Sequence, residues 1–157
     1  MAYKYFAKPA LLFVFTMISF STIDAQENDS LLQKKIKSRD YFFVPESVST
    51  STVTAPVTST EYGVSVSMDS IIAFLPFNGK SYSFSRPTQS SDESIKFVST
   101  NFEYSAVGKK KGKWEITIEP KDAKGVRLFL IVFSNGNAEM DVISPGKETM
   151  LFKGYVF

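Results

Sequence analysis

Few residues of this chain have the types and spacing that covalent chemistry needs. Cysteine and histidine are both absent from its 157 residues, which excludes disulfides, Cys/His zinc sites, cysteine nucleophiles and Ser-His-Asp triads. Asp92 and Glu93 are adjacent carboxylates, but acid–base catalysis needs carboxyl groups that converge on a cleft, and neighbours in an extended chain point apart. Lys80 and Ser81 lack the S-x-x-K spacing of a Ser-Lys pair. We therefore expect that the protein is not an enzyme.

Two further groups of residues could bind an ion or a phosphate. Asp69, Glu139 and Asp141 are potential calcium ligands, but the chain has no D-x-D-x-D-G loop to hold them. The run Lys109–Lys113 could bind phosphate or RNA, although its glycine favours the solvated tip of a turn. The glycines match neither G-x-G-x-x-G nor a Walker motif, and a net charge of +2 is too balanced to indicate nucleic acid. We expect no metal, no cofactor and no nucleic-acid partner.

The aromatic residues are the remaining candidates for a binding site. Phenylalanine alone accounts for 15 residues, and aromatic rings suit the walls of ligand pockets. Within a barrel, Phe102, Tyr104, Trp114 and Tyr82 are the candidate lining for a small apolar or amphipathic ligand. Side chains can, however, just fill a barrel of about eight strands. Two functions therefore stay open: a structural or interaction module of the cell envelope with a filled core, which we favour, and a ligand binder.

The first 25 residues are expected to be a cleaved signal peptide. Lys4 and Lys8 precede an apolar run over residues 9–20, and small residues follow up to Ala25. This is the layout of a secretory signal, and the run is too short to span a bilayer. The segment contains no cysteine for lipid attachment. We expect a periplasmic or secreted protein without a membrane span after cleavage, whose partner is an unknown envelope protein or a small apolar ligand.

A short helix and one β-domain are expected after the signal peptide. Residues 26–40 are assigned to the helix, because Ser30 and Gln33 have the spacing of a capping box, and residues 41–157 to the β-domain. Residues 41–44 predict a strand that Pro45 ends at a sheet edge. The Ser/Thr-rich segment 47–60 is compatible with a glycosylated or flexible linker, but the strand preference of Thr and Val favours an edge strand and a loop.

Alternating apolar and polar residues predict the strands of this domain. The pattern is one-sided at residues 64–68, 113–119 and 138–142. Asn78-Gly79 predicts a hairpin from strand 71–77 to a return strand at 80–84, followed by a polar loop at 86–94. The phase of the alternation changes within residues 95–106, which indicates a break near Ser99. Residues 126–133 are apolar on both faces, so we expect a central strand covered on both sides, with Leu31, Leu32 and Ile36 of the helix as the cover.

Several blocks of the chain resemble one bacterial family. They are VSMDSIIAFLPFNGKSY (66–82), IKF (95–97), KKKGKWEITIE (109–119), FSNGNAEMDVIS (133–144) and LFKGY (151–155). Together they are similar to the family called domain of unknown function 4251, whose members are exported by Gram-negative bacteria. The resemblance implies a lipocalin-like β-barrel and supplies no activity. With the strand pattern, it predicts an all-β antiparallel meander of about eight or nine strands, forming a barrel or half-barrel with a short N-terminal helix, as a monomer.

Overall fold

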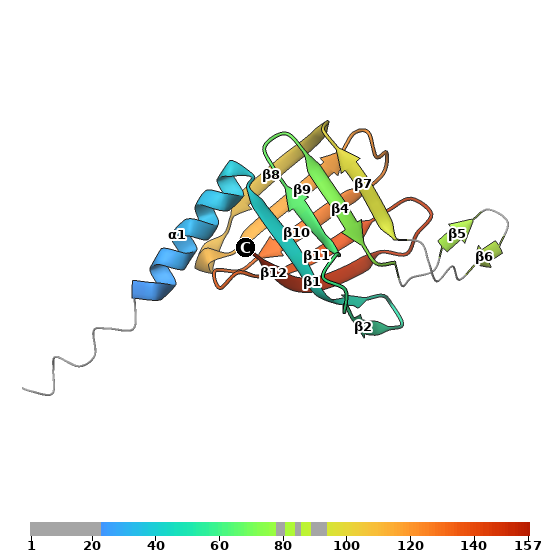
Figure 1. The fold of residues 1–157 in the computed structure, drawn as a ribbon, viewed down its shortest axis with the longest axis horizontal. Helices are drawn as coiled ribbons and strands as arrows, with labels where there is room; N and C mark the ends of the chain where they lie inside the picture. The colour runs from blue at the N-terminus through green and yellow to red at the C-terminus, as the bar shows by residue number, and fades with distance from the viewer. Residues whose placement is uncertain (1–22, 78–80, 84–85, 89–93) are drawn as a thin grey trace, which may run out of the picture.

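The protein folds into one helix and an antiparallel sheet that is nearly closed into a barrel (Figure 1). The structure is a computed structural model, and it describes residues 23–77, 81–83, 86–88 and 94–157. The elements in chain order are α1 (Ile23–Ser38), β1 (Tyr41–Ser49), β2 (Thr54–Pro56), β3 (Gly63–Val66), β4 (Ile71–Leu75), β5 (Ser81–Ser83), β6 (Arg86–Thr88), β7 (Ile95–Ser99), β8 (Phe102–Gly108), β9 (Trp114–Pro120), β10 (Arg127–Val132), β11 (Asn137–Ile143) and β12 (Met150–Val156). A single 3-10 turn, Lys110–Gly112, joins β8 to β9.

The sheet follows the order of the chain around the barrel. Its strands are arranged β7-β4-β3-β1-β12-β11-β10-β9-β8, and β2 pairs with the second half of β1. The pairing of β1 with β12 brings the first strand beside the last. The two edge strands, β7 and β8, are consecutive in the chain and only Thr100 and Asn101 separate them. The chain thus passes from one edge of the sheet to the other, which confirms the expected meander and barrel.

The corner between β7 and β8 confirms the break expected near Ser99. Ser99 is fully buried, and its hydroxyl donates a hydrogen bond to the Asn101 carbonyl at 3.1 Å. The Lys121 amide donates to the same carbonyl at 2.7 Å, and the Thr100 amide donates to the Asp122 carboxylate at 3.3 Å. These bonds satisfy the backbone groups that the sheet leaves unpaired at the corner.

The seam between β1 and β12 corrects the prediction made for Pro45. Instead of ending at a sheet edge, β1 continues to Ser49, with a bulge between Pro45 and Ser47 opposite Gly154. The bulge explains why a proline is tolerated within a paired strand. A Cβ atom on Gly154 would overlap the carbonyl oxygen of Val44. The backbones of the two strands approach so closely here that only glycine fits.

The barrel interior is filled by the inward-facing side chains. Trp114, Ile116 and Ile118 of β9 are buried while the residues between them are partly exposed, as the alternation predicted. All other strands of the main sheet except β2 and β8 contribute side chains that are at most 2% exposed. The largest of these are Phe43, Phe152, Ile71, Leu75, Leu128, Leu130, Met140 and Met150.

The prediction that β10 is covered on both faces is wrong. Its inner residues Leu128, Leu130 and Val132 are at most 2% exposed. Its outer residues Phe129 and Ile131 are only partly buried, and neither belongs to the core cluster. They lie between polar neighbours on β9 and β11, which shield part of each apolar side chain. The helix lies elsewhere.

Three other local predictions need correction. Met68, expected to face inward with Val64 and Val66, is 73% exposed because β3 ends at Val66. The helix begins at Ile23, so Ser30 lies inside it and not at a capping position. β4 pairs with β7, whereas residues 81–83 pair with β6, inside the segment expected to be a polar loop. Asn78-Gly79 lies outside the described residues.

The Ser/Thr-rich segment 47–60 contains strand and loop. Ser47–Ser49 belong to β1, and Thr54–Pro56 form β2, which folds back onto them. The Ser51 hydroxyl and amide both donate to the Glu148 carboxylate, which ties the intervening loop to the β11–β12 connection. Within the described part of the chain, no helix has the length and apolar character needed to cross a bilayer.

Candidate functional site

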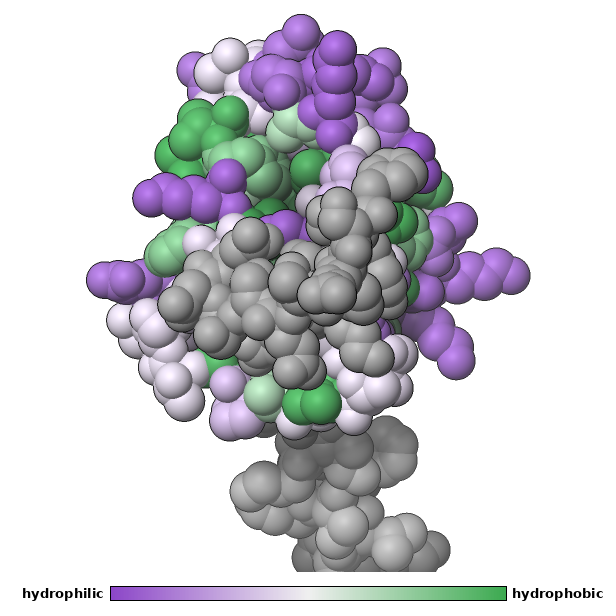
Figure 2. Space-filling view, turned by 90° about the vertical axis from the view of Figure 1, so that its right-hand side faces the viewer, coloured by the Kyte–Doolittle hydropathy of each residue, from purple (hydrophilic) through white to green (hydrophobic). Residues whose placement is uncertain are grey.

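One end of the barrel is covered by α1 (Figure 1). Because successive strands alternate in direction, this end collects the β8–β9 and β10–β11 turns and the end of β12. The helix lies close to all three. Lys37 lies over the ring of Trp114 at the start of β9, with 5.9 Å between its Nζ and the ring centroid. A groove separates α1 from residues 134–136 and 156–157. Figure 2 shows the opposite end, where hydrophilic side chains project around the rim between smaller apolar areas.

The helix inserts two apolar side chains into the barrel core. Leu32 and Ile36 lie four residues apart, so they share one face of the helix. Leu32 is 7% exposed and Ile36 is fully buried within the core cluster. Leu31, expected to join them, is 52% exposed. The helix therefore packs into the end of the barrel and closes it. The sequence had predicted instead that the helix covers β10.

A chain of hydrogen bonds joins α1 to the barrel wall. The Tyr41 hydroxyl donates to the Tyr104 hydroxyl at 3.3 Å, and the Tyr104 hydroxyl donates to the Ile36 carbonyl at 2.9 Å. The Ile36 carbonyl, in the last turn of α1, thus accepts from Tyr104 as well as from the Arg39 amide, at 3.3 Å. The Arg39 guanidinium lies 4.9 Å from the centroid of the Tyr104 ring. Tyr41 and Tyr104 are 63 residues apart in sequence, so no local pattern could have paired them.

Both hydroxyls are held in the protonated form. Burial raises the pKa of Tyr41 well above its usual value, and the nearby Tyr104 and the hydrogen bond to it act in the same direction. Burial also raises the pKa of Tyr104, against smaller opposing effects of the Tyr41 hydrogen bond and the Arg39 charge. The folded state thus binds these protons more tightly than the unfolded chain. The contribution of these two tyrosines to the stability of the folded state is therefore fully present below pH ~10, the pKa of tyrosine in the unfolded chain. It is lost as the pH rises through their raised pKa values in the folded state.

Replacing Tyr104 with phenylalanine should weaken the attachment of the helix. The substitution removes one of the two donors to the Ile36 carbonyl, the other being the Arg39 amide, and leaves the Tyr41 hydroxyl without the Tyr104 acceptor. We therefore expect a loss of about 1–3 kcal/mol in the free energy of unfolding. The loss of stability above pH ~10 should also become smaller. Urea denaturation at neutral and alkaline pH measures both effects. Tyr155→Phe, at a 39% exposed tyrosine, is the control; equal effects of the two substitutions would contradict the assignment.

The expected ligand-lining residues lie in different surroundings. Trp114 is 9% exposed and belongs to the buried core. Phe102 and Tyr104 are partly buried and pack against that core. Tyr82 lies in β5, away from the barrel sheet, and its side chain lies outside the described residues. The structure thus brings Tyr104 and Trp114 to the helix-covered end, where both contact α1.

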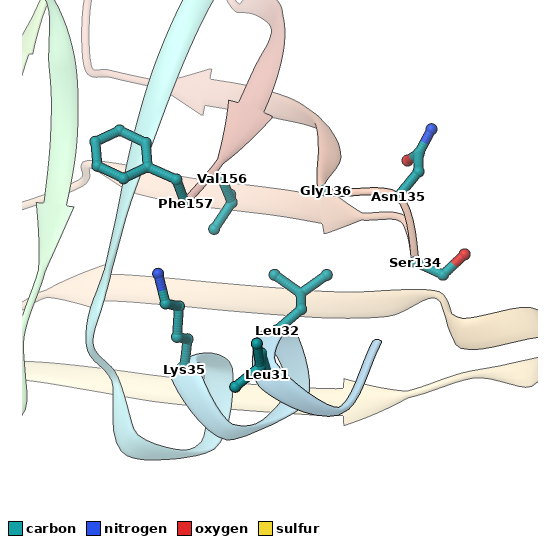
Figure 3. Close-up of a pocket in the computed structure, with 8 residues that line it drawn as sticks. All are labelled: Leu31, Leu32, Lys35, Ser134, Asn135, Gly136, Val156 and Phe157. Carbon is teal, nitrogen blue, oxygen red and sulfur yellow. The ribbon is translucent and has the colours of Figure 1, made fainter. Parts of the chain in front are cut away.

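The hollow at this end is a groove on the surface beside the helix. It measures about 300 Å³ and is lined by Leu31, Leu32, Lys35, Ser134, Asn135, Gly136, Val156 and Phe157. Figure 3 shows Leu32 and Lys35 extending from α1 toward the C-terminal strand. The side chains of Ser134 and Asn135 point away from that strand. Its walls are mainly apolar, with one ammonium group at the side. The sequence indicated only a hairpin turn at Asn135-Gly136, because the groove exists only once the helix is docked.

The polar candidates that the structure describes lie at separate places in the fold. Asp92, Glu93 and Lys80 lie outside the described residues, and Ser81 belongs to β5. Asp69 lies in the β3–β4 turn, where hydrogen bonds from Ser67 and Ser70 lower the pKa of its carboxyl. Glu139 and Asp141 are on the partly exposed face of β11. Partial burial, with a smaller effect of Glu139, raises the pKa of Asp141. Among the described residues, no three acidic side chains cluster as metal ligands would.

Comparisons with known proteins are consistent with this fold. The domain of unknown function (DUF4251) family matches residues 24–156. The crystal structure of a DUF4251 family protein from Bacteroides eggerthii superposes with a TM-score of 0.64 at 15% sequence identity, covering 83% of this chain and 87% of the other. That degree of identity supports a shared fold. No curated protein matches this chain. The fold and the match over nearly the whole described chain show that this protein belongs to the DUF4251 family.

Proposed function

We propose that this protein is a non-catalytic interaction module of the bacterial cell envelope. The observation that carries the proposal is the filled barrel: Phe43, Phe152 and Ile36 are fully buried among the other core side chains. A lipocalin-type carrier instead needs free volume inside its barrel. The surface, in contrast, offers a groove and charged side chains for a partner. The lack of histidine and cysteine supports a role without catalysis.

Export is part of the proposal. The basic and apolar segments before Ala25 have the layout of a secretory signal. The family match begins at residue 24, close to the proposed cleavage after Ala25. We propose that this chain acts in the periplasm or outside the cell as a monomer.

The alternative function is the binding of a small amphipathic ligand, now at the surface groove instead of inside the barrel. Leu31, Val156 and Phe157 provide apolar contact there, and Lys35 provides a positive charge. A ligand with a short apolar chain and an acidic group matches this lining. The groove is open on one side and buries less of a ligand than an internal cavity would, which is why the interaction module remains the first proposal.

Native mass spectrometry of the protein purified from its own host tests both proposals. We expect the mass of residues 26–157 without a bound molecule, and no quenching of Trp114 fluorescence by fatty acids or sterols. A stoichiometric lipid or hydrophobic metabolite would favour the ligand binder. A mass that retains Met1, with the protein in the membrane fraction, would contradict signal cleavage.

A further inference from the structure

The helix-covered end of the barrel is strongly basic. Residues 26–40 and 108–115 contain eight basic side chains, Lys34, Lys35, Lys37, Arg39, Lys109, Lys110, Lys111 and Lys113, and four acidic ones, Glu27, Asp29, Asp40 and Glu115. The whole chain has a net charge of +2, so the rest of it carries more acidic than basic side chains. The nearly neutral net charge of the chain therefore does not show that basic side chains are concentrated at one end of the folded protein.

Contacts on the structure place the two basic segments side by side. Lys37 of α1 lies over the Trp114 ring. The same indole is the nearest neighbour of Gly108, at the start of the β8–β9 turn. Lys109 and Lys113 both pair with Glu115, at 3.1 and 3.2 Å between nitrogen and oxygen. We call the exposed lysines of the two segments, Lys34, Lys35, Lys37, Lys109, Lys110 and Lys111, the basic end.

Most of this charge is not neutralised within the protein. Lys34, Lys35, Lys110 and Lys111 form no ion pair with any carboxylate that the structure describes. A favourable interaction with the helix dipole explains a cation in the last turn of α1, such as Lys35 or Lys37. It does not explain the lysines of the β8–β9 turn. Placing so many like charges together costs free energy, which an anionic partner would recover.

We propose that the basic end docks on an anionic phospholipid surface. Lysines are flexible point charges, and here they are spread over a helix and a turn instead of surrounding one anion. This spacing suits a membrane surface that presents many anionic headgroups. Each basic side chain then adds a modest electrostatic attraction to that surface. Two apolar side chains flank the basic end, Leu31 at 52% exposure and Phe157 at 58%. Such residues enter the boundary between headgroups and acyl chains.

The order of the chain also favours a membrane over other polyanions. The basic end contains α1, which directly follows the apolar segment 9–20 that we propose to be the export signal. Before cleavage, that signal would hold α1 next to the bilayer. The inference rests on the proposed export, and it specifies the partner of the proposed interaction module. It predicts that the mature protein keeps the same end toward the membrane.

Vesicle binding by residues 26–157 tests the inference. We expect co-sedimentation with vesicles that contain phosphatidylglycerol, little with phosphatidylcholine alone, and a marked loss as salt is raised. The variant K34Q/K37Q/K110Q/K111Q should bind phosphatidylglycerol vesicles about six hundredfold more weakly, since each of the four lysines near the surface contributes about fivefold. The control K121Q/K124Q/R127Q/K147Q removes the same charge from the opposite end, at the start of β10 and in the β9–β10 and β11–β12 connections, and should keep its binding.

Melting curves must first show that both variants are folded. Equal binding to the two kinds of vesicle, or equal losses in the two variants, would overturn the inference. Binding to single-stranded DNA or to polyglutamate without binding to vesicles would also overturn it and would assign the basic end to a soluble polyanion. If vesicles are not bound and the purified protein holds no small molecule, the membrane inference fails while the interaction module remains.

Discussion

Replacing Gly154 with alanine is expected to cost about 3 kcal/mol or more of the free energy of unfolding. The added Cβ atom would overlap the Val44 carbonyl oxygen, and it would also lie 3.0 Å from the Cα atom of Pro45. Both obstacles are backbone atoms, so no rotation of a side chain can relieve the overlap. The strands must separate at the β1–β12 seam, where the first and last strands of the barrel meet. Overpacked sites cost about 1–3 kcal/mol even when side chains can move.

Gly108→Ala is the matched control. A Cβ atom on Gly108 would meet the Trp114 ring at 3.4 Å, an ordinary contact with a side chain. We expect its stability to change by less than about 1 kcal/mol. Urea denaturation of both variants, followed by circular dichroism, measures the difference. Similar midpoints for Gly154→Ala and the unmodified protein would show that the two strands are farther apart than the structure indicates.

Removing the helix should have the second large effect. Deletion of residues 27–38 removes the buried side chains of Leu32 and Ile36 and the carbonyl that accepts the Tyr104 hydrogen bond. Each large-to-small change at a buried aliphatic residue costs about 2–5 kcal/mol. The total is comparable with the whole stability of a small domain, about 5–15 kcal/mol. We therefore expect a protein that aggregates or melts at a much lower temperature.

Single substitutions separate packing from the other consequences of the deletion. Ile36→Ala should cost about 2–4 kcal/mol, because the side chain is fully buried in the core. Leu31→Ala is the control on the same helix, and its 52% exposure limits the expected cost to about 0.5 kcal/mol. Thermal melting of the deletion variant, Ile36→Ala and Leu31→Ala, each against the unmodified protein, measures these effects. If the deletion or Ile36→Ala leaves the melting temperature unchanged, the helix does not close the barrel.

Local patterns determined the strands and the chemistry that is absent. The alternation of Trp114, Ile116 and Ile118 with polar residues predicted β9 and its buried face, because side chains of a strand point alternately to its two sides. The change of phase near Ser99 predicted the corner between β7 and β8 for the same reason. The lack of cysteine and histidine excluded whole classes of active site without any structure. Each of these conclusions depends only on residue type or on near neighbours in the chain.

The tertiary structure decided which elements meet. The apolar spacing of Leu32 and Ile36 indicated a buried helix face, but not that this face closes the end of the barrel. The two apolar faces of β10 did not reveal that Phe129 and Ile131 stay partly exposed. Pro45 read as the end of a strand, because the glycine that accommodates its bulge lies more than a hundred residues later. Partners at such separations are set by closure of the whole sheet, which no short window of sequence encodes.

The basic end illustrates the same division. The composition correctly gave a nearly neutral chain, and the run Lys109–Lys113 read as a solvated turn, as the exposure of Lys109–Lys111 confirms. The lysines of α1 are some seventy residues earlier, and they join that turn only because the helix packs where β8 turns into β9. Charge adds up in space and not along the chain, since Coulomb interactions depend on the distance between the charges. Residue types therefore determined what chemistry this protein can carry, and packing alone determined where its charges meet.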